Sequence, residues 1–102
     1  MPVSSELHDF VLNRDGCCFL YKFDPQHVCR DAWGDPHDPH DLNKLTLDHV
    51  HLHAGGTRGK RAPDDAQHLV ALCSRINVDG PSRAIREAER EYLKALYPEG
   101  DV

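Results

Sequence analysis

An acid and a histidine stand side by side near the middle of the chain, at the end of an apolar run. Asp48 and His49 lie near the end of the stretch KLTLDHV, and a loop that contains Gly55 and Gly56 follows. A carboxylate is a hard oxygen ligand for a divalent cation, and an imidazole exchanges a proton near neutral pH. Because neighbouring side chains of a strand point to opposite faces, the pair can serve one site only where the strand ends and the chain bends.

Positive charge follows this pair. The chain of 102 residues has a net charge of −5, but a run of acidic residues lies between Asp24 and Asp41 and most of the basic residues lie in the second half. Salt limits the reach of distant acids to about 8–10 Å, so a local basic face can attract phosphate. Arg58, Lys60, Arg61 and Arg75 are therefore candidates for contacts with phosphate.

The composition indicates the class of protein. A chain of this length, with 39% hydrophobic residues and few aromatics, suits one domain with a small core that a metal or a partner would help to stabilise. It has no run of about 18 apolar residues, and no basic start followed by an apolar centre, so we expect neither a membrane span nor a signal peptide. We therefore expect a cytoplasmic protein whose four cysteines are reduced thiols or metal ligands.

Helices are predicted near both ends of the chain. In residues 5–13, Leu7, Phe10 and Val11 recur at helical spacing, and the following Asp-Gly pair stops the pattern. In residues 82–97, Ser82 is a good N-cap, an apolar stripe runs along one side, and Pro98 ends the helix. The arginines of this second helix form either its solvated side or a basic face toward phosphate.

The strands are less evenly marked. Aromatic and apolar residues favour a strand in CCFLYKF, residues 17–23, and residues 29–44 are expected to be a loop held by Trp33. KLTLDHV, residues 44–50, alternates apolar and polar residues and is predicted to be a second strand. Residues 64–77 begin like a helix but contain the apolar run HLVALC, and periodicity alone does not decide between a helix and a buried strand.

Three motifs together resemble the signature of the HNH endonucleases. They are the Asp-His pair, the glycine loop and HLVALCSRIN, which match the pattern D-H, G-G, and N-L-x-x-L-C-x-x-C-[HN]; with RDGCC the resemblance extends over about residues 14–80. Within that family the chain is most similar to small HNH proteins of phages that infect actinobacteria. The resemblance implies an α+β fold with a ββα-metal (His-Me finger) motif at about residues 45–80, between the two terminal helices. Its second strand would be residues 68–73, and its helix would begin near Ser74.

The resemblance also implies roles for single residues. The general base falls on His49, the metal-binding acid before it on Asp48, and the closing residue of the motif on Asn77. The central Asn of the family is replaced here by His68, which can still donate a hydrogen bond through a ring nitrogen. The second helix-side cysteine is replaced by Ile76.

These roles imply hydrolysis of the phosphodiester bonds of double-stranded DNA, by nicking or by cutting both strands. His49 would take a proton from water, and Asp48 and Asn77 would hold Mg²⁺, Mn²⁺ or a similar divalent ion. The basic loop would hold the DNA backbone. The resemblance further implies phage genome packaging beside a terminase, in the cytoplasm of the host.

A structural zinc site is a separate expectation from the same resemblance. Cys18, Cys29 and Cys73 fall near the ribbon zinc of the family, and His27 and Cys17 are candidates for the fourth ligand. The alternative is that these cysteines are buried apolar thiols.

Two other functions stay open. One is a zinc-stapled module that binds DNA or a terminase without cleaving. The other is a nuclease that acts on RNA or as a toxin, because phosphate contacts carry no information about the sugar.

Overall fold

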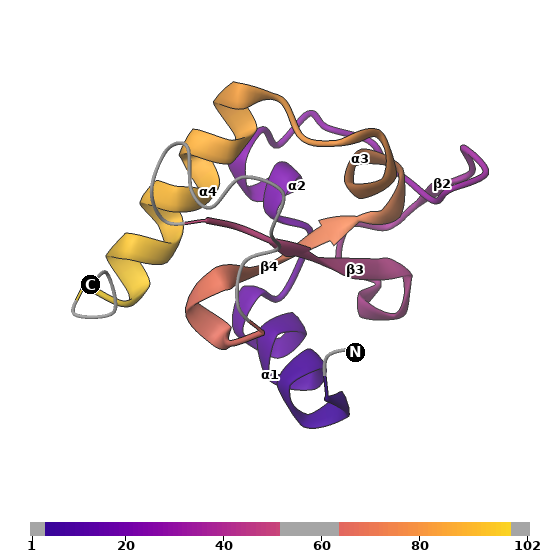
Figure 1. The fold of residues 1–102 in the computed structure, drawn as a ribbon. Coiled ribbons are helices and arrows are strands. Elements are labelled where there is room, and N and C mark those ends of the chain that lie inside the picture. The colour runs from indigo at the N-terminus through magenta and orange to yellow at the C-terminus, as the bar shows by residue number, and fades with distance from the viewer. Residues whose placement is uncertain (1–3, 52–63, 99–102) are drawn as a thin grey trace.

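The computed structural model describes residues 4–51 and 64–98. The described part is a small α+β structure with two antiparallel sheets of two strands each (Figure 1). In chain order, the elements are α1 (Ser5–Asp15), α2 (Phe19–Phe23), β1 (Cys29–Arg30), β2 (Pro36–His37), β3 (Leu45–His49), β4 (Leu69–Cys73), α3 (Ser74–Asp79) and α4 (Arg83–Leu96), with short 3-10 helices at Leu42–Lys44 and Ala66–His68.

The hairpin of β3 and β4 crosses the middle of the molecule (Figure 1). Its register pairs Leu45 with Cys73 at one end and His49 with Leu69 at the other. All five residues of β4 are buried, as expected for a strand covered on both faces, and α3 begins at the residue after β4. The prediction of a strand at residues 68–73 and a helix from Ser74 is confirmed.

The two terminal helices are also confirmed, and local capping explains their limits. The hydroxyl of Ser4 accepts the N–H of Leu7, and Gly16 ends α1 in a left-handed conformation with φ 72°. The hydroxyl of Ser82 accepts the N–H of Ile85 at the start of α4. Both helices therefore begin and end close to the predicted residues.

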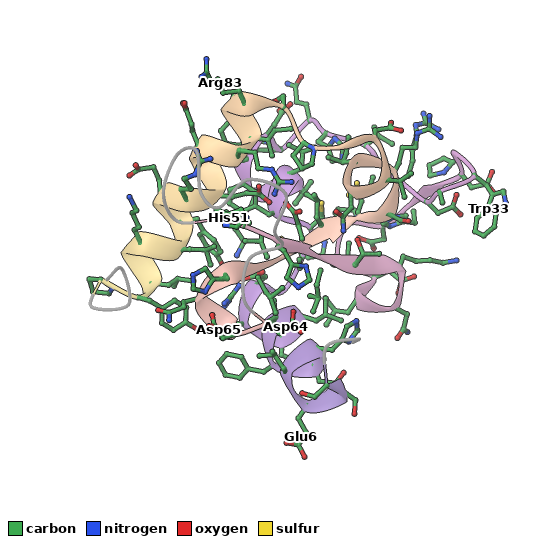
Figure 2. All side chains as sticks on the ribbon, viewed as in Figure 1. Glu6, Trp33, His51, Asp64, Asp65 and Arg83 are labelled. Carbon is green, nitrogen blue, oxygen red and sulfur yellow. The ribbon has the colours of Figure 1, made fainter. Side chains whose placement is uncertain are left out.

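Two local predictions are wrong. Residues 17–23 do not form a strand: Cys18 caps α2, and its N–H donates to the carbonyl of Pro39. A short apolar run fits either element, and here burial of Phe19 and Leu20 is achieved on a helix. Residues 29–44 are not all loop, because β1 and β2 pair within them. Trp33 is 87% exposed at the tip of that hairpin, so its side chain is not the buried anchor that was expected (Figure 2).

A buried ion pair joins α1 to the hairpin. Asp15 is fully buried, and its carboxylate accepts hydrogen bonds from Arg14, from the N–H of Ala71 at 2.8 Å and from the hydroxyl of Tyr92 at 2.5 Å. Arg14 also donates to the carbonyls of Ala66 and Leu69, each at 2.6 Å. Burial, together with the Asp15 carboxylate, raises the pKa of Tyr92 above its usual value. One carboxylate therefore fixes α1, β4 and α4 relative to one another.

Among the described residues, no helix has both the length and the apolar content that crossing a bilayer requires.

The Asp15 carboxylate should carry a large share of the stability. Asp15→Asn removes the charge but keeps the shape, leaving the buried guanidinium of Arg14 without its counter-ion. We expect a loss of about 3–5 kcal/mol in the free energy of unfolding, measured by urea denaturation. Asp9→Asn, on the exposed side of α1, is the control and should change it by less than about 0.5 kcal/mol. Equal stability of the two variants would contradict this role of Asp15.

Candidate functional site

Four potential metal ligands meet beside the end of β4. The Sγ atoms of Cys18, Cys29 and Cys73 and a ring nitrogen of His27 all lie within 4.8 Å of one another. The three cysteines are fully buried, and none of them is in a disulfide. The donor types and spacing suit a single metal ion, so this group is a candidate metal centre.

The group is assembled from segments that are far apart in the sequence. Cys18 is the N-cap of α2, Cys29 begins β1, and Cys73 ends β4. His27 lies at the end of a turn in which its N–H donates to the carbonyl of Asp24. The sequence indicated these four residues but left the fourth ligand open between His27 and Cys17. The structure places His27 in the group, whereas Cys17 is not part of it.

The three thiols of this group differ in pKa. The N–H of Cys73 donates to Sγ of Cys18 at 3.2 Å, and Nε2 of His27 lies 3.4 Å from Sγ of Cys73. Hydrogen bonds from Cys18 and His27 lower the pKa of Cys73 to about 4, despite its burial. The hydrogen bond to Cys73, together with burial, raises the pKa of Cys18, and burial raises that of Cys29 to about 12. The thiolate form is therefore favoured at Cys73, and a bound cation would favour thiolates at the other two cysteines.

A second candidate site lies at the end of β3. Asp48 is buried, and its Oδ2 accepts a hydrogen bond from Nη1 of Arg86 on α4 at 2.8 Å. The same nitrogen donates to the carbonyl of His49 at 3.0 Å. The imidazole of His49 is turned elsewhere: its Nε2 lies 2.7 Å from Oδ1 of Asp64. The predicted acid and base are thus adjacent in the chain, and each has its own partner.

The remaining residues of the predicted motif also have partners. Nδ2 of Asn77 donates to Oγ1 of Thr46 at 2.9 Å and to the carbonyl of Leu47 at 3.0 Å, which fastens α3 to β3. Nδ1 of His68 lies 2.5 Å from Oδ1 of Asp65, in the segment where Figure 2 labels Asp64 and Asp65. Asn77 therefore lies against the strand that carries Asp48, whereas the imidazole of His68 pairs with the carboxylate of Asp65.

The sequence reading missed two residues of α4 that line this site, Arg86 and Glu89. Glu89 is fully buried beside Asp48, with its Oε1 3.6 Å from Nη1 of Arg86. Burial raises the pKa of Glu89 to about 10, Asp48 acts in the same direction, and Arg86 and Arg90 oppose it. A signal for this existed, because position 89 lies four residues from both Ile85 and Leu93 of the apolar stripe.

The predicted phosphate contacts are only partly covered by the structure. Arg58, Lys60 and Arg61, with the two loop glycines, lie outside the described residues. Arg75 lies on α3, where its Nε donates to Asp79 at 3.0 Å and about half of its side chain is exposed. This arginine is accessible to a partner molecule.

Comparison with known protein families, curated proteins and solved structures found no match. The two groups of side chains above are therefore the basis on which a function can be proposed.

Adjacent cysteines provide a matched test of the metal centre. Cys18→Ser removes a thiolate ligand, whereas Cys17→Ser changes a neighbour outside the group. Protein purified without added metal should carry about one equivalent of a transition metal in the wild type and in Cys17→Ser, and much less in Cys18→Ser. Elemental analysis by mass spectrometry measures this. Equal metal content in the two variants would mean that Cys18 is not a ligand.

Proposed function

We propose that the chain is a metal-dependent endonuclease of the HNH type that hydrolyses phosphodiester bonds of double-stranded DNA. The observation that carries the proposal is the unit formed by β3, β4 and α3. Asp48 and His49 end the first strand of this unit, and Asn77 reaches back to the same strand from its helix. Two antiparallel strands followed directly by a helix are compatible with the ββα arrangement that the resemblance implies, and this supports the proposal.

The residues of this unit have complementary chemistry. His49 accepts a proton from the attacking water, and the contact of its Nε2 with Asp64 fixes the orientation of the ring. Asp48 and the amide oxygen of Asn77 are hard oxygen donors suited to Mg²⁺ or Mn²⁺. When bound, such an ion polarises the phosphate and stabilises the leaving oxygen. Arg86 neutralises Asp48 in the present arrangement, so it has to move away when a cation takes its place.

The Cys and His group is proposed to be a structural zinc site. Three thiolates and an imidazole form a donor set that zinc prefers, and it has no open position for a substrate. Its ligands come from α2, the segment before β1, β1 itself and β4, so the ion would join segments that share only a small core. Zinc binding would then contribute directly to folding.

Contacts with DNA are assigned to the basic residues that follow His49 in the chain and to Arg75. Arg58, Lys60 and Arg61 follow His49 in the chain, and Arg75 is exposed on α3. Their charge would hold the phosphate backbone irrespective of base sequence. A place beside a phage terminase in genome packaging, in the cytoplasm of the host, is proposed on the resemblance alone.

A non-cleaving module that binds DNA or a terminase is the second candidate. It is favoured by one observation: Nη1 of Arg86 already donates a hydrogen bond to Oδ2 of Asp48, the proposed metal ligand. A nuclease directed at RNA is a third, because the same catalytic groups would serve it.

A plasmid-cleavage assay distinguishes these candidate functions. We expect nicking or linearisation in Mg²⁺ or Mn²⁺, and none after brief treatment with EDTA, which removes a weakly held ion before a thiolate-bound one. His49→Ala should lose at least about 100-fold in rate, as for removal of a general base. His8→Ala, on α1, is the control and should keep the wild-type rate.

A parallel digest of structured RNA identifies the substrate class. DNA binding without cleavage would favour the binding module, and cleavage of RNA alone would favour the RNA nuclease. Wild-type cleavage by His49→Ala would reject His49 as the base.

A further inference from the structure

Glu89 is the buried group that the fold leaves unexplained. It is 0% exposed, and neither Oε1 nor Oε2 forms a hydrogen bond within the described part of the chain. A buried carboxyl without partners costs several kcal/mol, and an Ala or Leu at this position would continue the apolar stripe of α4 without that cost. The oxygens of Glu89 are therefore candidates for contacts with a ligand.

The surroundings of Glu89 indicate the kind of ligand. Asp48 lies beside it with a side chain that is 4% exposed, and Arg86 lies between the two carboxylates. Nη1 of Arg86 is 2.8 Å from Oδ2 of Asp48 but 3.6 Å from Oε1 of Glu89. The arginine therefore hydrogen-bonds to Asp48 and to the carbonyl of His49, and Glu89 is left without a hydrogen bond from it.

Two carboxyl groups share one guanidinium in this buried cluster. Ionisation of the second carboxyl is therefore disfavoured as long as Arg86 is the only cation in contact with both. A divalent cation in place of the guanidinium would neutralise both carboxylates and give the oxygens of Glu89 a partner. Because the side chain of Arg86 is 32% exposed, it can turn toward solvent when it is displaced.

We propose that Glu89 is a ligand of the divalent cation bound by Asp48, so that α4 completes the metal site formed by β3 and α3. The inference rests on the proposed function for the identity of the cation but not on cleavage itself. Two carboxylates and an amide oxygen suit Mg²⁺ or Mn²⁺, whereas the thiolates of the other centre suit softer ions. The two metal centres are therefore chemically distinct.

Mn²⁺ binding tests the proposal without relying on catalysis. Electron paramagnetic resonance measures free Mn²⁺ in titrations of the wild type, Glu89→Gln and Asp48→Asn, each purified with its thiolate centre loaded. We expect Glu89→Gln to bind Mn²⁺ at least about tenfold more weakly, because it loses a unit charge in direct contact with the ion. Glu87→Gln, on the exposed side of α4, is the matched control and should bind like the wild type.

Folding of the variants is checked by circular dichroism. Glu89→Gln keeps the volume of the side chain and replaces a carboxyl whose ionisation is disfavoured by burial, so α4 should remain intact. Glu89→Asp, which keeps a shorter carboxylate, should bind Mn²⁺ with intermediate affinity, and this order supports ligation even if Glu89→Gln is less stable.

The outcomes separate this inference from the proposed function. Weakened Mn²⁺ binding in Glu89→Gln supports the ligand role even if the wild type cleaves no DNA. If Asp48→Asn weakens binding and Glu89→Gln does not, Glu89 is only a neutral carboxyl beside Asp48, and the inference is overturned while metal-dependent cleavage can still stand. If the wild type binds no Mn²⁺ outside the thiolate centre, the inference is overturned as well.

Discussion

The structure depends on a carboxylate that has to be satisfied away from water. Asp15 reaches that state only when Arg14, the N–H of Ala71 and the hydroxyl of Tyr92 all lie within hydrogen-bond distance. Because the cost of an unpaired buried charge exceeds that of most other local changes, α1, β4 and α4 have little freedom to pack in any other way. These hydrogen bonds therefore also fix the position of the hairpin that carries the candidate catalytic residues.

The opposite end of β4 is held by different chemistry. Cys73 lies there beside Cys18, His27 and Cys29, and hydrogen bonds from Cys18 and His27 lower its pKa. In a chain with so small a core, a metal ion bound here would replace these hydrogen bonds by metal–ligand bonds and would link four segments of the chain. The strand is thus fixed by a salt bridge at its beginning and by a potential metal centre at its end.

The proposed catalytic site is less local than its motif. The Asp-His pair and Asn77 lie in one hairpin and its helix, yet the carboxylate of Asp48 faces α4 and contacts Arg86. Glu89 enters the same space from the next turn of that helix. Whether Asp48 holds a cation therefore depends on where α4 packs, and this packing is governed in part by Tyr92 and Asp15.

The sequence by itself determined the features that arise from near neighbours. Ser4, Gly16 and Ser82 set the limits of α1 and α4, and alternation identified β3, because capping and periodicity are local effects. The strand β4 and the four Cys and His residues were indicated by motif resemblance. Only the tertiary structure decided that residues 19–23 are helical, that His27 rather than Cys17 joins the thiols, and that Arg86 and Glu89 meet Asp48. Each of these depends on contacts between residues far apart in the chain, whose free energy exceeds local preference. The periodicity of α4 places Glu89 on its apolar stripe, but it does not identify the residue that Glu89 meets.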